Sequence, residues 1–427
     1  MNDRHSIGPL RLPTELRVAL VLIVASVVAA GCSGETQPSA TGSSGASHRP
    51  PSIPLDVTIV QENLSIPWDV AFAPDGRMYV SERLGRIQVF ASGEPGAEHL
   101  ETVEVQDVHS IGEAGVMGLA VDKDFSNFPF LYVCASRDPD DDAGAAPWIN
   151  ELLRYRVTDT SLEFEGPVFD STIRANRQHN GCAVETDDDG HIWMTVGDAL
   201  TRMNGLSQLN NLNGKVLRLN RDGTPPDDNP IMFDDTEPGL IYTIGHRNPQ
   251  GITFEPQGGQ PYTAEHGPTT NDEINRLVAG GNYGWPCYVA TDYISDESGG
   301  HETLNIDCGP PEDYLGAAWA SGEATIATSN LVFLTGDRWG EWTGDLIVAT
   351  LKEMELRRFE LDAGGNPQSV EALLDEEYGR LRAAVIGPDG ALYVTTSNAR
   401  NNSGQGVTPA PEDFSDVIIR IAPSEGD

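Results

Sequence analysis

Residues 69–82 read DVAFAPDGRMYVSE and residues 85–90 read GRIQVF, and the pattern in these residues indicates the fold class. It holds a short apolar strand, a turn built on Asp75 and Gly76, a second strand rich in apolar and aromatic residues, and a third strand beside an arginine. Short apolar runs bounded by turn residues are typical of antiparallel sheets. The stretch therefore predicts one small three-stranded unit.

The same pattern recurs, so that the chain holds six copies of it. The copies begin at Asp69, Met117, Cys182, Gly251, Asn330 and Ala383. A unit of this size cannot bury both of its faces alone, so we expect the copies to stack radially as blades. The sequence predicts an all-β fold, a six-bladed β-propeller, in preference to a β-sandwich built from similar hairpins.

The charge composition argues against two classes of binding partner. The 427 residues include 27 basic and 65 acidic side chains, which gives a net charge of 27 − 65 = −38. Nucleic acid and a bare anionic membrane would both be repelled by this charge. The 45 glycines and 29 prolines indicate a turn-rich globular chain and argue against coiled coils, helical bundles and disorder.

The amino terminus has the pattern of an export signal. Arginines precede an uncharged apolar run at residues 18–30, and these 13 residues are fewer than the ~20 that cross a bilayer as a helix. Small residues immediately before Cys32 resemble the lipobox of bacterial lipoproteins. We expect a signal peptide at 1–31, lipid attachment at Cys32, a flexible tether at 32–52 and the propeller at 53–427. An ordinary signal peptide, with Cys32 unmodified, is the alternative.

Four cysteines remain beyond Cys32, and an exported chain is in an oxidising compartment where two disulfides are expected. Four cysteines allow three pairings. We favour Cys287 with Cys308, because both lie in turn-rich loops close in sequence, which leaves Cys134 with Cys182. A zinc site is the weaker alternative, since no CxxC spacing occurs.

Polar residues gather in loops, where propellers carry their functional groups. The segments are RQHNG at 177–181, GHRNPQG at 245–251, EHGPTTNDEIN at 265–275 and GGNYGWP at 280–286. His179 on its own could merely cap a turn. With Arg247 nearby, however, a neutral imidazole could take a proton while the guanidinium stabilises negative charge that develops elsewhere.

Several motifs in order carry a family resemblance. They are IPWDVAFAPDGRMYVSER (66–83), GEAGVMGLAVDKDF (112–125), QHNG (178–181), GKVLRLNRDG (214–223) with PPDDNP (225–230), GHRNPQG, EHGP with NDEIN, and NYGWP. From about Pro67 onward the chain resembles the soluble pyrroloquinoline quinone (PQQ) dependent glucose and aldose sugar dehydrogenases, the glucose/sorbosone dehydrogenase family. The family fold is a six-bladed propeller, in agreement with the repeat count.

The resemblance implies roles for individual residues. His179 matches the base that takes the proton of the sugar C1 hydroxyl as hydride passes to C5 of the quinone. Arg247 matches the residue that stabilises the C5 oxygen, and Asn248 a neighbouring cofactor contact. Gly267 and Pro268 match positions whose backbone carbonyls hold the calcium ion that polarises the quinone, and hard oxygen ligands suit that ion.

Two further groups follow from the resemblance. Glu273 and the carbonyl of Tyr283 match ligands of a further calcium site, although an acidic surface loop would look similar. Lys352, Arg380 and Arg382 match the cations that bind the three PQQ carboxylates, and the Arg-x-Arg spacing places both guanidinium groups on one face of a strand. Solvated surface cations are the alternative.

The chain departs from the family pattern at three places. Glu113 stands where a glutamine often contacts the cofactor, and its negative charge could weaken the binding of an anionic ligand. Cys182 and Ala183 replace a Gly-Arg pair, and residues 396–398 replace a more acidic turn. We expect these changes to affect substrate choice and the affinity for PQQ.

The sequence therefore predicts an exported, lipid-anchored enzyme that oxidises the C1 hydroxyl of aldoses to lactones and passes the electrons to a further acceptor. A calcium-dependent propeller lactonase is one alternative. A propeller that binds an extracellular carbohydrate or protein without catalysis is another. Lys352, Arg380 and Arg382 discriminate, because neither alternative needs a cluster that binds a tricarboxylate.

Overall fold

The structure of the chain, a computed structural model, describes residues 52–138, 148–200, 211–232, 236–289, 292–293, 310–398 and 416–424. The predicted signal peptide, Cys32 and nearly all of the tether lie outside these residues. The described residues belong to one compact unit, which spans 45–427. No helix in the described segments is long and apolar enough to cross a membrane.

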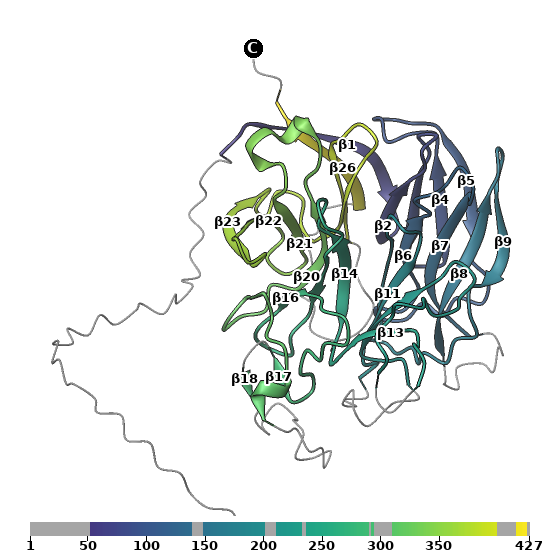
Figure 1. Cartoon of the computed structure of the whole chain (residues 1–427). Helices are drawn as coiled ribbons and strands as arrows, with labels where there is room; N and C mark the ends of the chain where they lie inside the picture. Colours follow the sequence, from purple (N-terminus) through teal and green to yellow (C-terminus); the bar gives the residue numbers. More distant parts are fainter. Residues whose placement is uncertain are drawn as a thin grey trace, which may run out of the picture. The chain divides into compact units, whose positions relative to one another are not determined.

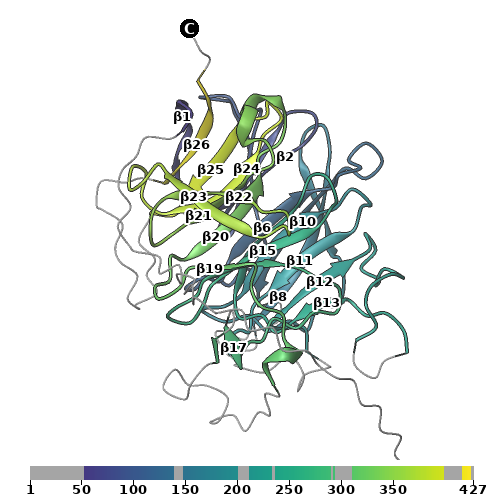
Figure 2. The same cartoon turned by 60° about the vertical axis from the view of Figure 1, so that its left-hand side comes forward.

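Six four-stranded antiparallel sheets form the blades of a propeller, which confirms the predicted fold class (Figures 1 and 2). Blade 1 comprises β2 (Pro67–Phe72), β3 (Met78–Glu82), β4 (Arg86–Phe90) and β5 (His99–Glu104). Blade 2 comprises β6 (Val116–Val121), β7 (Phe130–Arg137), β8 (Ile149–Val157) and β9 (Leu162–Pro167). Blade 3 comprises β10 (Gly181–Thr186), β11 (Ile192–Val196), β12 (Lys215–Leu219) and β13 (Ile241–Ile244).

The second half of the ring has the same construction. Blade 4 comprises β14 (Pro249–Phe254), β15 (Pro261–Glu265), β16 (Glu273–Arg276) and β19 (Trp319–Ala320). Blade 5 comprises β20 (Thr328–Phe333), β21 (Leu346–Thr350), β22 (Leu356–Leu361) and β23 (Pro367–Leu373). Blade 6 comprises β24 (Leu381–Ile386), β25 (Leu392–Thr396), β26 (Asp416–Pro423) and β1 (Leu55–Leu64). Outside the blades lie the hairpin of β17 (Tyr288–Val289) and β18 (Asp292–Tyr293) and the short helices η4 (Pro311–Asp313) and η5 (Asp337–Trp342).

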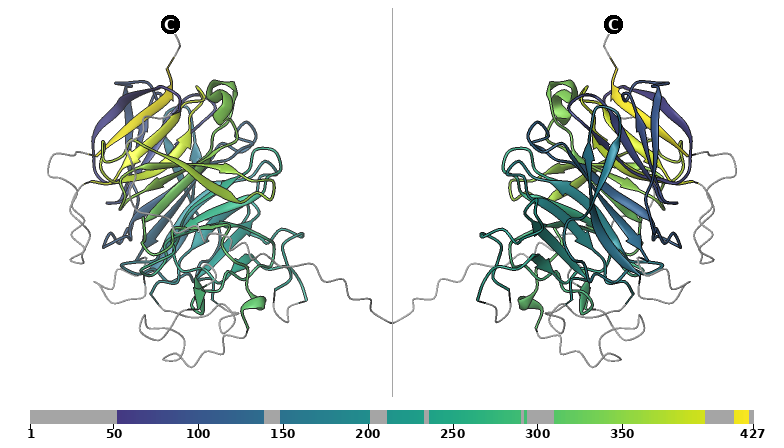
Figure 3. Two further views of the ribbon diagram at one scale, coloured as in Figure 1. Left: turned by 90° about the vertical axis from the view of Figure 1, so that its left-hand side faces the viewer. Right: turned by 90° about the vertical axis from the view of Figure 1, so that its right-hand side faces the viewer.

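The inner strands β2, β6, β10, β14, β20 and β24 close the ring, because each packs against the inner strands of the two neighbouring blades. Blade 6 contains both ends of the described chain. Its outermost strand, β1, pairs with β26, so that Leu55 lies opposite Pro423 and Leu64 opposite Asp416. Figure 3 shows this purple strand alongside the yellow one. The pairing adds the first strand of the chain to the last blade and so closes the ring.

Local chemistry explains the repeated hairpins. In blade 1 the amide of Gly76 donates to the carbonyl of Ala73 at 2.9 Å, and Gly76 has a φ of 95°, which glycine adopts without steric cost. The middle strands β3 and β11 are buried along their whole length, because neighbouring blades cover both faces of each sheet. These continuous apolar strands made the repeats visible in the sequence.

The structure adds a fourth, outer strand to each three-stranded unit that the sequence predicts. It also confirms the disulfide between Cys134 in β7 and Cys182 in β10, which joins blade 2 to blade 3. Cys287 is disulfide-bonded as well, and its predicted partner Cys308 lies outside the described residues.

Candidate active site

The predicted catalytic and cofactor residues gather at one end of the propeller channel, where the inner strands begin. His179 lies two residues before β10, Arg247 and Asn248 precede β14, and Arg382 lies at the start of β24. Segments far apart in the sequence therefore meet at this end of the ring. Glu113, in the loop before β6, lies among them.

His179 is oriented by a buried carboxylate. Its Nδ1 lies 2.7 Å from Oδ1 of Asp198, whose other oxygen accepts a hydrogen bond of 2.8 Å from the indole nitrogen of Trp285. His179 is 9% exposed and Asp198 is 1% exposed. The carboxylate can only accept, so the ring proton is assigned to Nδ1. The lone pair on Nε2 is then free to take a proton.

The backbone of His179 is also constrained. Its φ of 61° is left-handed, a conformation that a histidine adopts at an energetic cost. Its amide donates to Oε2 of Glu113 at 2.9 Å and its carbonyl accepts from the amide of Ala199 at 2.9 Å. A Cβ at Gly197 would overlap that carbonyl, so glycine is required there. The loop holds the imidazole in one place.

Arg247 lies beside this pair. Its Nη1 donates to the carbonyl of His266 at 3.0 Å, and its guanidinium lies over the ring of Trp285, 5.3 Å from the ring centre. Its backbone amide donates to Glu265. Burial lowers the pKa of Arg247, and the neighbouring carboxylates, Asp198 first among them, oppose that shift. A fixed guanidinium of this kind can stabilise negative charge on a ligand.

Asn248 and Glu113 link the catalytic groups to the predicted cation cluster, which comprises Lys352, Arg380 and Arg382. Asn248 is fully buried, and its Oδ1 accepts from the amide of Gly181 at 3.1 Å and from Nε2 of Gln250 at 3.0 Å. Its Nδ2 donates to Oε2 of Glu113 at 3.4 Å. Gln250 in turn accepts a hydrogen bond of 3.1 Å from Nη1 of Arg382.

The three predicted cations differ in their surroundings. Arg382 is 6% exposed and its guanidinium carbon lies 3.5 Å from the centre of the Trp68 ring. Burial lowers its pKa to about 9, and the nearby charge of Arg380 lowers it further while Glu113 opposes the shift. Arg380 donates to the carbonyl of Leu351 at 3.1 Å. Lys352 is exposed, and its Nζ donates to the carbonyl of Thr325 at 2.7 Å. Arg380 and Arg382 thus share one electrostatic environment, whereas Lys352 lies in solvent.

Three of the four predicted calcium ligands line one small cavity, namely Gly267, Glu273 and Tyr283, together with Glu265 and other residues. Pro268, half-buried, follows Gly267 in the same loop. No group of three or more His, Cys, Asp or Glu side chains in the described residues forms a metal site. The oxygens that could hold an ion here would therefore come largely from backbone carbonyls, to which calcium is suited.

Several buried donors at this end of the channel have no hydrogen-bond partner. They include Nε of Arg247 and Nε of Arg382, and Nε2 of the His266 ring is a further buried nitrogen without a partner. Burial, together with the charges of Arg247 and Arg382, lowers the pKa of His266 to about 3, so its ring is neutral. A buried donor without a partner costs about 1–3 kcal/mol, which an anionic ligand rich in acceptors would remove.

The sequence analysis did not select Asp198, Trp285 or His266. Each lies in or beside a motif of the sequence, since Asp198 follows the second strand of the third repeat, Trp285 lies in GGNYGWP and His266 in EHGP. The acidic residue at the end of a strand beside a candidate base was the signal that could have identified Asp198.

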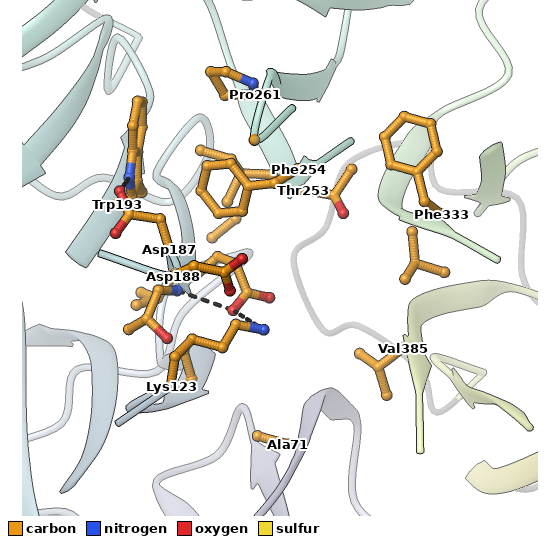
Figure 4. A pocket seen from close by; sticks show the side chains of 18 of the residues that line it. Ala71, Lys123, Asp187, Asp188, Trp193, Thr253, Phe254, Pro261, Phe333 and Val385 are labelled. Atoms are coloured by element: carbon orange, nitrogen blue, oxygen red, sulfur yellow. Dashed lines mark hydrogen bonds and ion pairs between the residues drawn. The ribbon is translucent and has the colours of Figure 1, made fainter. Parts of the chain in front are cut away.

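A larger cavity lies elsewhere. It has a volume of about 870 Å³ and is lined by the later halves of the six inner strands, away from His179 and Arg247. Figure 4 shows Lys123, Asp187 and Asp188 on one side of it, and Phe333 and Val385 on the other. Lys123 pairs with Glu185 at 3.9 Å. The cavity holds none of the predicted site residues, so its size does not identify it as the reaction site.

Comparisons with known proteins identify the family of the chain. A family model described as Glucose / Sorbosone dehydrogenase matches residues 64–405. Quinoprotein glucose dehydrogenase B of Acinetobacter calcoaceticus is 31% identical over 421 residues, covering 81% of this chain and 86% of that protein. Aldose sugar dehydrogenase YliI of Escherichia coli is 28% identical over 355 residues, covering 81% and 91%. The PQQ-bound aldose sugar dehydrogenase of Streptomyces coelicolor superposes with a TM-score of 0.65 at 25% identity, covering 87% and 99%.

Proposed function

Because the chain belongs to the glucose/sorbosone dehydrogenase family, we propose that it is a PQQ-dependent dehydrogenase of aldose sugars that oxidises the C1 hydroxyl to give the lactone. The observation that carries this proposal is the His179–Asp198 pair beside a group of buried nitrogen donors without partners. A base next to an anion site is what such a reaction requires.

The donor set fits PQQ. The cofactor carries three carboxylates, and the unpartnered Nε atom of Arg382 and the nearby guanidinium of Arg380 would bind them. Arg247 and Asn248 would contact the quinone part, and the carbonyls of Gly267 and Pro268 would hold the calcium ion. When bound, PQQ supplies the two-electron acceptor for the hydride.

The chain's own residues move the proton. Nε2 of His179 accepts the proton of the sugar C1 hydroxyl, and the resulting imidazolium is stabilised by Asp198 through the hydrogen bond at Nδ1. Trp285 holds the carboxylate in place from its other oxygen. Arg247 would stabilise negative charge on the C5 oxygen of the quinone.

The other readings have less support. Neither a lactonase nor a carbohydrate-binding propeller needs the buried guanidinium of Arg382 beside the half-buried one of Arg380, whereas the binding of a tricarboxylate does need such cations. No described feature favours either alternative.

Reconstitution tests the proposal. Protein stripped of metal with a chelator should oxidise glucose and other aldoses in a dye-linked assay only when PQQ and Ca²⁺ are both added, because the cofactor carries the redox chemistry and the ion orients it. Magnesium in place of calcium is the matched control. Sugar oxidation without PQQ would contradict the assignment.

We also propose export and lipid anchoring at Cys32, which rest on the lipobox and the short apolar run before it. The acidic body provides no electrostatic attraction to an anionic membrane, so an acyl chain, at about 0.8 kcal/mol per buried methylene, would provide the attachment. Cys32→Ala should then appear in the soluble fraction after cell lysis, and a membrane-bound variant would exclude the anchor.

A further inference from the structure

Arg83 is a buried cation at the same end of the channel that the proposed function does not use. It directly follows β3 and is 5% exposed. One guanidinium nitrogen, Nη1, donates to the carbonyl of Gly112, and Nε is buried without a hydrogen-bond partner. Among the ion pairs of the described residues, none involves Arg83.

The charges around Arg83 belong to the cation cluster. Glu113 is the neighbouring charge that favours the protonated form of Arg83, while burial lowers the pKa of Arg83. The same carboxylate acts on Arg380 and on Arg382, and the charge of Arg83 in turn disfavours that of Arg382. The buried Arg83 and Arg382 and the half-buried Arg380 therefore share Glu113 as a nearby counter-charge, while Asp416 also acts on Arg380 and Asp69 on Arg382. Nε of Arg83 and Nε of Arg382 are nevertheless buried without an acceptor, which is unfavourable unless an anion joins them.

The fold itself does not require this charge. The backbone of Arg83 already anchors the loop, because its amide donates to the carbonyl of Ile66 at 3.1 Å and its carbonyl accepts from the amide of Val116 at 3.1 Å. The contact with the carbonyl of Gly112 needs one N–H donor, which an uncharged side chain could supply. The unpartnered Nε and the positive charge remain to be explained.

We infer that Arg83 binds a carboxylate of the anionic cofactor, so that the anion site consists of Arg83, Arg380 and Arg382. This inference rests on the proposed function. It places a ligand from blade 1 beside two from the adjacent blade 6, and the guanidinium of Arg382 lies over the ring of Trp68. The negative charge of Glu113 reduces the repulsion among the guanidinium groups, and it also lowers the net attraction of the site for the anionic cofactor.

Calorimetric titration of the full-length apo-protein with PQQ in the presence of Ca²⁺ tests the inference. Arg83→Gln keeps an N–H donor for Gly112 and removes the charge, and it should weaken PQQ binding by at least about tenfold. Arg86→Gln is the matched control, since Arg86 lies three residues away but pairs with Glu82 at 3.0 Å and is 34% exposed. It should bind PQQ as the wild type does.

A second variant keeps the test decisive if the first one folds poorly. Arg83→Lys retains the charge, so its affinity should lie between those of the wild type and Arg83→Gln when the melting temperatures of the apo-proteins are alike. Wild-type affinity in Arg83→Gln, or equal affinities in both variants, would overturn the inference and leave the proposed function standing. No PQQ binding by the wild type would overturn both.

Discussion

Asp198→Asn is expected to lower kcat about 10- to 150-fold while the affinity for PQQ stays within a few-fold of the wild type. Oδ1 of Asp198 accepts from the amide of Leu200 at 2.9 Å and bonds Nδ1 of His179, while Oδ2 accepts from Trp285. An asparagine has only one acceptor oxygen in place of the two carboxylate oxygens. In either orientation its NH2 group would therefore face an N–H donor that Asp198 accepts from in the wild type. The variant also loses the anion that stabilises the imidazolium.

The magnitude follows from the hydrogen bond that is lost. A hydrogen bond to a charged group contributes about 1.5–3 kcal/mol, and each 1.36 kcal/mol corresponds to about tenfold in rate. The affinity for PQQ should change little, because Asp198 lies on the histidine side of the site and not among Arg380 and Arg382. Single-turnover rates of the reconstituted enzyme measure the effect on the chemical step separately from product release.

The chain contains its own control. Asp187 bonds Nδ1 of His191 at 3.1 Å and accepts from the indole of Trp193 at 2.9 Å, which repeats the same three residue types at the other end of the channel. Asp187→Asn should therefore have no effect on kcat. If Asp198→Asn turned over at the wild-type rate, or if both variants lost activity equally, the assignment of Asp198 as the residue that positions the base would be wrong.

His179→Ala should lower kcat by about 10²- to 10⁴-fold in steady-state assays with little change in PQQ affinity, and an unchanged kcat would make His179 structural. Arg382→Ala should weaken PQQ binding at least about tenfold in calorimetry, and Lys352→Ala should do so to a smaller extent because its side chain is exposed. Burial lowers the pKa of Arg382 to about 9, so PQQ affinity should decline as the pH rises above that value and the site loses charge. Replacing Cys134 and Cys182 by serine frees a loop with a sequence separation of 48 and should lower the free energy of unfolding by about 4 kcal/mol, measured by denaturant titration.

The sequence predicts the blades because their inner and middle strands are apolar along most of their length. The outer strands are harder to find. β5 alternates between exposed and half-buried residues, and such a short polar run resembles a loop. The pairing of β1 could not be predicted from the local sequence either. Its partner β26 lies at the opposite end of the chain, and the composition of neither strand indicates that the two pair.

The site shows the same division. His179, Arg247 and Asn248 could be found because each lies in a short motif that resembles a family pattern. The roles of Asp198 and Trp285 come from distances between three separate loops. Arg83 lies within a quoted motif too, but its lack of a partner is a property of packing, and a sequence does not show which polar atoms are left unsatisfied.

The joining of β1 to β26 has a consequence for the order in which the site forms during synthesis. The amide of Ile66 donates to Oδ2 of Asp416 at 3.0 Å across 350 residues, and bringing segments so far apart together costs about 5 kcal/mol of chain entropy. Trp68 comes from the first blade made, whereas Arg382, which lies on its ring, comes from the last. A nascent chain can complete five blades and still lack the site that contains Trp68 and Arg382, because the ring closes only when the final strand has been made. If the chain binds PQQ as proposed, only finished molecules should bind it, and loss of the last strand should abolish binding even where most of the sheet remains.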